Sequence, residues 1–266
     1  MIKRFTSPIL GLVLDMDGVL WKDNSPIGDL PAIFNNIRTR RLKVVLATNN
    51  ATSSVPEYLA KIHRFGVELE PWQIVTSAMA SAHALLKAFP EKGAVYIVGE
   101  NGLISELRDN GFVPITDPDD ESPVIAVIAG MDRTLNYQKL RRATFHIRDG
   151  VPFYGTNPDT TFPTPLGLVP GAGSIIAAIE TATGVKPIMI GKPSPFIFEL
   201  SAERMNLNNN EFLVVGDRLE TDIAGGQALG ARTALVLSGV STSQQASIWK
   251  PQPDVIVKDL TELVSL

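Results

Sequence analysis

The segment GLVLDMDGVLW, residues 11–21, places two aspartates directly after a short apolar run. The run before Asp15 is typical of a strand that lies inside a sheet. Residues two apart in an extended segment face the same side, so Asp15 and Asp17 can address one ligand. Gly18 permits a tight turn after them, and we expect Trp21, beyond the turn, to be a packing residue.

The same apolar pattern returns along the chain and alternates with helical spacing. Further strands are predicted at 42–49, 94–99, 124–130, 212–217 and 232–238, and helices at 30–41, 55–65, 101–111, 171–184 and 195–206. Strands that are apolar throughout and separated by helices favour parallel sheets covered on both faces. The predicted fold class is therefore α/β with a doubly wound, Rossmann-like core, in which ligands bind at the carboxyl ends of the strands.

The composition excludes several classes of protein. A net charge of −4 provides no basic field for nucleic acid, and the basic run 38–43 is typical of a helix C-terminus. The absence of cysteine excludes disulfides and thiolate zinc sites. No stretch approaches the ~18 apolar residues of a membrane span. We therefore expect a cytoplasmic protein with a small-molecule ligand.

Polar side chains gather where the predicted strands end. They are Asp15 and Asp17, Thr48 and Asn49, Lys192, Asp217, and Asp222 shortly after it. Each aspartate, threonine or asparagine alone is typical of a helix N-cap. Capping explains neither the lysine nor the doubled aspartate, so we interpret the set as one site.

Phosphoryl transfer through an aspartyl-phosphate needs this combination. A carboxylate attacks phosphorus, and Mg²⁺ bound by Asp15 and Asp217 neutralises the phosphate. Thr48 can donate a hydrogen bond to a phosphoryl oxygen, and Lys192 can offset negative charge. A neutral Asp17 can protonate the leaving oxygen and later activate water.

The strings DMDGV (15–19), LATNN (46–50), IGKPSP (190–195) and VVGDRLETDI (214–223) resemble the four motifs of the haloacid dehalogenase-like hydrolase superfamily. The resemblance implies that Asp15 is the nucleophile and Asp17 the general acid and base, with its main-chain carbonyl on the metal. It also implies phosphate binding by Thr48 with its neighbour Asn49 and by Lys192, and metal binding by Asp217 supported by Asp222.

More than a hundred residues separate the second motif from the third, which resembles the nitrophenylphosphatase-like branch with its inserted α/β cap. We place this cap at 82–186 and the core at 1–81 and 187–266. The segment 156–165, TNPDTTFPTP, is expected to be a loop because of its prolines. The resemblance suggests that this loop faces the core site, with Asn157 and Asp159 as substrate contacts, and that the protein forms a homodimer.

We therefore predict a Mg²⁺-dependent phosphatase that acts on phosphate monoesters of small metabolites. Three alternatives stay open at this point. The same residues could run a phosphotransferase or a phosphomutase if another acceptor replaced water. A receiver-type phospho-switch uses a similar set on a similar sheet, but it is much shorter and lacks the acid partner two residues after the nucleophile. The third alternative is a binding protein without catalysis.

Overall fold

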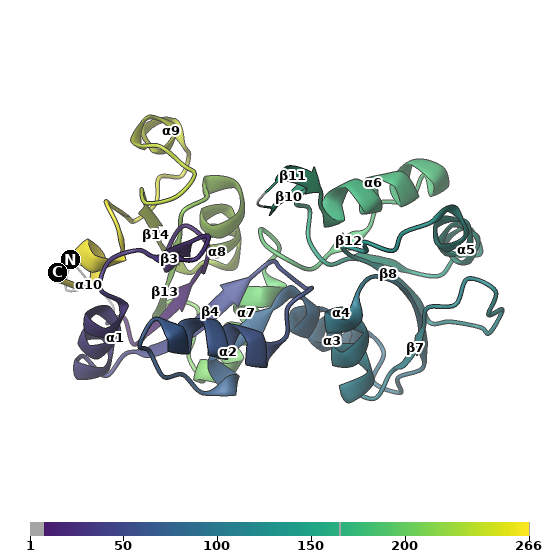
Figure 1. Cartoon of the computed structure of the whole chain (residues 1–266), viewed down its shortest axis with the longest axis horizontal. Helices are drawn as coiled ribbons and strands as arrows, with labels where there is room; N and C mark the ends of the chain where they lie inside the picture. Colours follow the sequence, from purple (N-terminus) through teal and green to yellow (C-terminus); the bar gives the residue numbers. More distant parts are fainter. Residues whose placement is uncertain (1–7, 165, 266) are drawn as a thin grey trace. The chain divides into compact units, whose positions relative to one another are not determined.

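The computed structural model describes residues 8–164 and 166–265, which divide into two compact units. The first unit combines Met1–Thr48, Val55–Val75 and Lys192–Leu266. The second combines Asn49–Ser54 with Thr76–Gly191. Figure 1 shows both units, each with its own sheet and helices. Because the first unit is assembled from separate stretches, residues far apart in the sequence become neighbours within it.

A six-stranded sheet forms the centre of the first unit. Its order is β15 (Val255–Val257), β14 (Arg232–Val236), β13 (Phe212–Gly216), β1 (Gly11–Leu14), β4 (Lys43–Thr48) and β5 (Ile74–Thr76). Strand β1 is parallel to both of its neighbours, and Leu14 lies opposite Val215 on one side and Leu46 on the other. The carboxyl ends of these three strands therefore reach the same edge of the sheet, where the polar residues follow.

Helices cover this sheet on both faces. They are α1 (Leu30–Thr39), α2 (Val55–Arg64), α7 (Phe196–Met205), α8 (Ala224–Leu229), α9 (Ser243–Ile248) and α10 (Leu260–Ser265). Leu12 and Leu14 of β1 pack in one cluster with the apolar stripe of α1, whereas α7 packs against β1 and β4. The stripe of α1 has helical spacing, and Asp29 caps its start by accepting a hydrogen bond from Ala32 N at 3.0 Å. The predicted doubly wound core is confirmed.

The second unit has its own parallel sheet. Its order is β12 (Ile188–Met189), β9 (Phe153–Gly155), β8 (Ala126–Ala129), β6 (Ala94–Val98) and β7 (Val113–Ile115). The helices of this unit are α3 (Ser77–Ala88), α4 (Asn101–Asp109), α5 (Tyr137–Arg148) and α6 (Ala172–Thr183). Tyr96 and Val127 of the sheet share a core with Ile176 of α6. This unit is therefore also α/β.

Two details differ from the sequence-based expectation. The expected loop 156–165 contains a strand, because β10 (Thr161–Thr164) pairs in antiparallel fashion with β11 (Gly167–Pro170). The predicted cap 82–186 lies inside the second unit, which additionally includes residues 49–54, 76–81 and 187–191 from the predicted core. Ser77 Oγ ties that segment to α3 by donating to Asn49 O at 2.5 Å. Its role as a cap stays a prediction.

In the described residues, every helix is too short or too polar to cross a membrane.

Candidate active site

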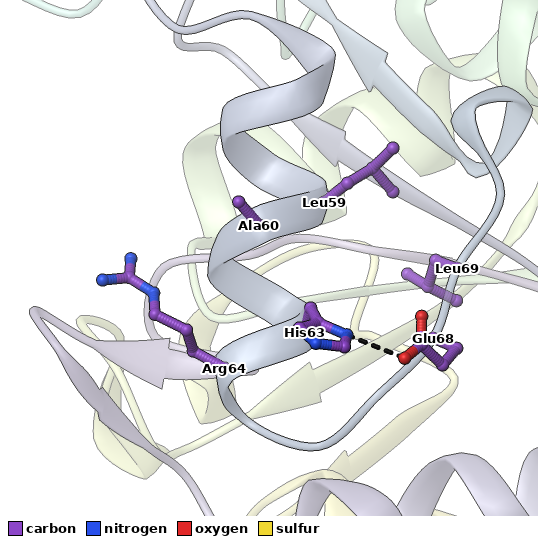
Figure 2. A pocket seen from close by; sticks show the side chains of 6 residues that line it. All are labelled: Leu59, Ala60, His63, Arg64, Glu68 and Leu69. Carbon is purple, nitrogen blue, oxygen red and sulfur yellow. Dashed lines mark ion pairs between the residues drawn. The ribbon is translucent and has the colours of Figure 1, made fainter.

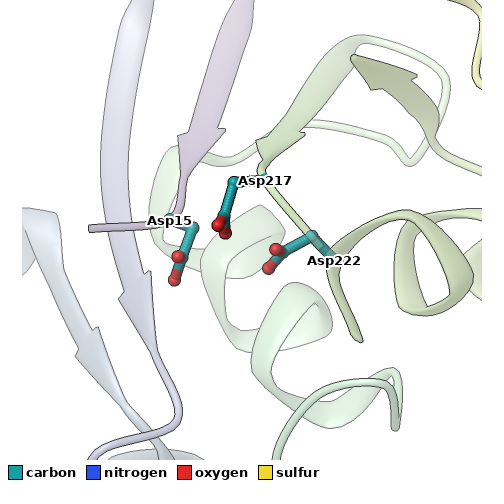
Figure 3. Close-up of side chains that lie close together, drawn as sticks. All are labelled: Asp15, Asp217 and Asp222. Atoms are coloured by element: carbon teal, nitrogen blue, oxygen red, sulfur yellow. The ribbon is translucent and has the colours of Figure 1, made fainter. Parts of the chain in front are cut away.

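Three aspartates meet at the carboxyl edge of the first unit's sheet (Figure 3). Asp15 follows β1, and Asp217 follows the neighbouring strand β13. Asp222 lies in a short π-helical turn, Leu219–Ile223, that comes after β13. One carboxylate oxygen from each lies within 4.8 Å of the other two. Asp217 and Asp222 are buried. Carboxylates this close repel one another unless cations lie between them.

Lys192 is the cation beside this cluster. Lys192 is 3% exposed, and its ammonium donates to Asp15 Oδ1 at 2.5 Å and to Asp222 Oδ1 at 2.7 Å. It also donates to the main-chain carbonyl of Ala47 at 3.1 Å. Burial alone would lower the pKa of Lys192, but the two carboxylates outweigh burial and raise that pKa above its usual range. The lysine is therefore a fixed positive charge next to Asp15.

One ammonium does not neutralise three carboxylates. Burial raises the pKa of Asp15 well above its usual range, although Lys192 acts in the opposite direction. Burial, together with the charge of Asp222, raises the pKa of Asp217 to about 6. Both shifts indicate that the cluster holds more negative charge than its protein surroundings stabilise. A divalent cation would balance the two charges that remain.

Asp217 offers an oxygen for such a cation. Its Oδ2 accepts a hydrogen bond from Val240 N at 2.7 Å, whereas its buried Oδ1 has no partner in the part of the chain that the structure describes. A buried carboxylate oxygen without a partner is costly. Gly18, at φ 84°, and Gly239 leave the space beside this carboxylate, because a Cβ at either position would collide with Asp217. Hard cations such as Mg²⁺ prefer oxygen ligands of this kind.

Asp222 is already engaged on both oxygens. Oδ1 accepts from Lys192, and Oδ2 accepts from Arg218 N at 3.2 Å. Gly216 allows its close approach, since a Cβ there would overlap the Asp222 side chain. These contacts are those of a carboxylate that orients its neighbours; support of a metal by Asp222 stays a prediction.

Asp17 lies outside the carboxylate cluster, although it is only two residues from Asp15. Its side chain is exposed, and its Oδ1 accepts a hydrogen bond from Trp21 Nε1 at 2.9 Å. Thr48 is buried at the end of β4, directly after Ala47. The structure thus brings Lys192 together with three of the predicted aspartates and leaves Asp17 at the exposed side of the turn.

The other predicted contacts lie in the second unit, where they bond to one another. Asn157 Nδ2 donates to Asn49 O at 2.8 Å, and Asn49 Nδ2 donates to Asp159 Oδ2 at 3.3 Å. Asp159 N closes the group by donating to Asn157 Oδ1 at 3.1 Å. Asn157 is buried, and its hydrogen bonds to Asn49 O and from Asp159 N are those of a residue that fixes the loop. Substrate binding by these residues stays a prediction.

Two groups at the site were not predicted from the sequence, the carbonyl of Ala47 and the indole N–H of Trp21. The carbonyl of Ala47 carries no signal in the sequence, because every residue has one. Trp21 was expected only to pack, and it does pack, yet it also donates to Asp17. The signal that could have found it is the need of a buried indole N–H for an acceptor.

A cavity of about 620 Å³ lies elsewhere on the first unit, along α2 (Figure 2). It is lined by Leu59, Ala60, His63, Arg64, Glu68 and Leu69. His63 Nδ1 and Glu68 Oε1 pair at 2.7 Å, but both side chains are more than half exposed. Exposed pairs of this kind contribute little to stability, and none of the clustered aspartates lines the cavity.

Comparison with known proteins is consistent with this geometry. Residues 12–113 match the family model described as haloacid dehalogenase-like hydrolase, and residues 189–263 match a related hydrolase model of the same type. The chain is 32% identical to the acid sugar phosphatase of Staphylococcus saprophyticus over 95% of both chains.

Two solved structures are similar over nearly the whole chain. The p-nitrophenyl phosphatase from Archaeoglobus fulgidus is 31% identical, with a TM-score of 0.88 over 97% of this chain and 98% of that one. The glycerol phosphate phosphatase from Mycobacterium tuberculosis, solved in complex with magnesium, is 34% identical. Its TM-score is 0.87 over 96% of this chain and 76% of that one.

Proposed function

Because this chain belongs to the haloacid dehalogenase-like hydrolases and is a phosphoric monoester hydrolase, we propose that it is a Mg²⁺-dependent phosphatase of small metabolites that works through an aspartyl-phosphate on Asp15. The observation that carries the proposal is the buried Lys192 ammonium, which bridges Asp15 and Asp222 next to Asp217, whose Oδ1 has no partner among the described residues. This arrangement suits a nucleophilic carboxylate that needs positive charge around it.

The residues present fit a magnesium ion. Asp15 and Oδ1 of Asp217 would hold it, with the main-chain carbonyl of Asp17 added by family resemblance and Asp222 in support. When bound, Mg²⁺ supplies positive charge to the non-bridging phosphate oxygens. A magnesium complex of the similar glycerol phosphate phosphatase supports this choice of metal.

The first chemical step is attack by Asp15. A bond forms between its carboxylate oxygen and phosphorus, and the bond from phosphorus to the leaving oxygen breaks. Asp17 gives its proton to that oxygen, so an alcohol leaves instead of an alkoxide. Lys192 and the Thr48 hydroxyl stabilise the charge on the transferring phosphoryl group.

The second step restores the enzyme. Asp17, now a carboxylate, takes a proton from water as the water oxygen attacks phosphorus. The bond between phosphorus and Asp15 breaks, which releases inorganic phosphate and regenerates both aspartates. Hydrolysis and transfer differ only in whether water or another hydroxyl enters at this step.

The proposal is tested by phosphate release from p-nitrophenyl phosphate and from a panel of metabolite monoesters, with Mg²⁺ or with EDTA. We expect release that needs Mg²⁺ and that Asp15→Asn abolishes while its circular dichroism spectrum stays that of wild type. Asp29→Asn is the matched control, because Asp29 is an exposed N-cap and asparagine caps equally well.

Near wild-type turnover in Asp15→Asn would contradict the mechanism. Release of the leaving group without inorganic phosphate would instead indicate transfer to another acceptor.

A further inference from the structure

Trp21 is buried beneath the turn that carries Asp17. Its side chain is 0% exposed, and its main chain closes the turn, since Gly18 N donates to Trp21 O at 2.8 Å. The hairpin of β2 (Trp21–Lys22) with β3 (Ser25–Pro26) continues from there. The main chain between residues 17 and 21 is therefore fixed, and the indole ring has a defined place relative to Asp17.

The indole ring is held on two sides by residues after the second motif. The rings of Trp21 and Phe65 lie 6.0 Å apart between centroids. Lys61 Nζ, from α2, lies 4.3 Å from the centroid of the Trp21 ring, which is the geometry of a cation–π contact. These contacts fix the direction in which the indole N–H points.

An indole nitrogen can only donate a hydrogen bond. Trp21 Nε1 donates to Asp17 Oδ1 at 2.9 Å, so that oxygen must act as an acceptor. A protonated carboxyl carries its hydrogen on one oxygen, and that hydroxyl oxygen is a weaker acceptor than the carbonyl oxygen, so a donor at Oδ1 disfavours a hydrogen there. In the described part of the chain, no side chain or main-chain donor is bonded to Oδ2. The hydrogen bond from Trp21 therefore makes Oδ1 and Oδ2 of Asp17 differ in their ability to carry the proton.

We propose that Trp21 is a positioning residue for the reaction, because its indole N–H occupies Oδ1 of Asp17 and assigns the transferable proton to Oδ2. The proposal rests on the function proposed above. In the first step the bond from hydrogen to Oδ2 breaks as the leaving oxygen takes the proton and parts from phosphorus. In the second step Oδ2 takes a proton from water. Trp21 itself exchanges no proton.

The test is Trp21→Phe, which retains an aromatic ring beside Phe65 and Lys61 but removes the donor. For an enzyme with a covalent intermediate, kcat/KM reports only the steps up to release of the alcohol. We would measure kcat/KM with Mg²⁺ on p-nitrophenyl phosphate, whose leaving group needs no proton, and on glycerol phosphate, whose leaving group does. We expect a loss of about tenfold on glycerol phosphate and less than about threefold on p-nitrophenyl phosphate.

Two further variants serve as the control and the reference for this measurement. Trp249→Phe is the matched control, since it also removes an indole donor, bonded to Gln227 Oε1 at 3.2 Å, and should leave the ratio of the two kcat/KM values unchanged. Asp17→Asn sets the size of the effect when the acid is lost altogether. A loss in Asp17→Asn that is equal on both substrates would contradict the proposed function itself.

If Asp17→Asn is selective and Trp21→Phe lowers both kcat/KM values equally, or neither, the inference about Trp21 is overturned. Should Trp21→Phe fail to fold, replacement of Trp21 by benzothienylalanine gives the same test, because it exchanges only the N–H for sulfur. The expected ratio of losses is the same for this replacement.

Discussion

Removal of one negative charge, by Asp217→Asn, should make the metal-free protein more stable than metal-free wild type. It should also abolish the stabilisation that wild type gains from Mg²⁺. The new amide would keep an oxygen for the hydrogen bond from Val240 N, which now measures 2.7 Å to Oδ2 of Asp217. The amide has no charge, so the buried position beside Asp222 no longer holds an uncompensated carboxylate. Its NH₂ group, in the place of the unpartnered Oδ1, cannot bind a cation.

The size of the effect follows from the pKa of Asp217. This pKa is raised from 3.8 to about 6 in the folded chain, chiefly by burial and then by Asp222. Because the folded state binds the proton more tightly than the unfolded state, stability falls as pH rises from about 4 to 6, and the full penalty is present above pH 6. A difference of about two pH units corresponds to about 3 kcal/mol, which Asp217→Asn should recover at pH 8 without metal.

The assay is urea unfolding of wild type and Asp217→Asn at pH 8 and at pH 4, in EDTA and in excess Mg²⁺. In EDTA at pH 8 the variant should be the more stable protein, and at pH 4 the two should unfold together. Adding Mg²⁺ should stabilise wild type by mass action and leave the variant unchanged. This account of the cluster would be refuted if the variant were less stable than wild type in EDTA at pH 8. It would also be refuted if Mg²⁺ stabilised the variant as much as wild type.

Two other outcomes follow from the same contacts. The affinity for Mg²⁺ should weaken about tenfold for each pH unit below about 6, because a proton then competes with the metal for Asp217. Calorimetric titration measures this affinity, and a value that is constant from pH 7 to 5 would contradict the prediction. Asn157→Ala should lower the free energy of unfolding by about 1–3 kcal/mol, since it removes the buried side chain that bonds Asn49 O and Asp159 N. The control Asn209→Ala removes an exposed hydrogen bond to Leu229 O and should lower the free energy of unfolding less. Equal melting temperatures of the two variants would contradict a stabilising role of the buried bonds.

Most of the fold could be predicted because parallel strands are buried on both faces and therefore appear as continuous apolar runs. The same reasoning located Asp15 and Asp217, since side chains that follow neighbouring parallel strands share an edge. Strand β10 was missed because the three prolines of segment 156–165 suggested a loop, yet a short two-stranded ribbon tolerates Pro163 where no ladder N–H is needed.

The remainder of the site depends on contacts between distant segments, which local patterns do not encode. Among the described residues, Val240 N bonds one oxygen of Asp217 and leaves the other without a partner, and Lys192 donates to the carbonyl of Ala47. The bond from Trp21 to Asp17 spans four residues, but it requires the turn at Gly18 to bring the indole back to the carboxylate. Segment 49–54 belongs to the second unit, where Ser77 Oγ donates to Asn49 O, and no compositional boundary in the sequence marks this segment.

The pairing of β1 with β13, which sets Gly11 opposite Phe212, has a consequence for the protein's synthesis on the ribosome. Strand β1 leaves the exit tunnel about two hundred residues before its partner β13, which emerges only after the whole second unit has been made. Until then β1 has an unpaired edge, and a nascent chain with such an edge is prone to wrong pairing. Asp15, the proposed nucleophile, is therefore made long before Lys192 and Asp217, and the proposed site is complete only once translation has passed Asp222.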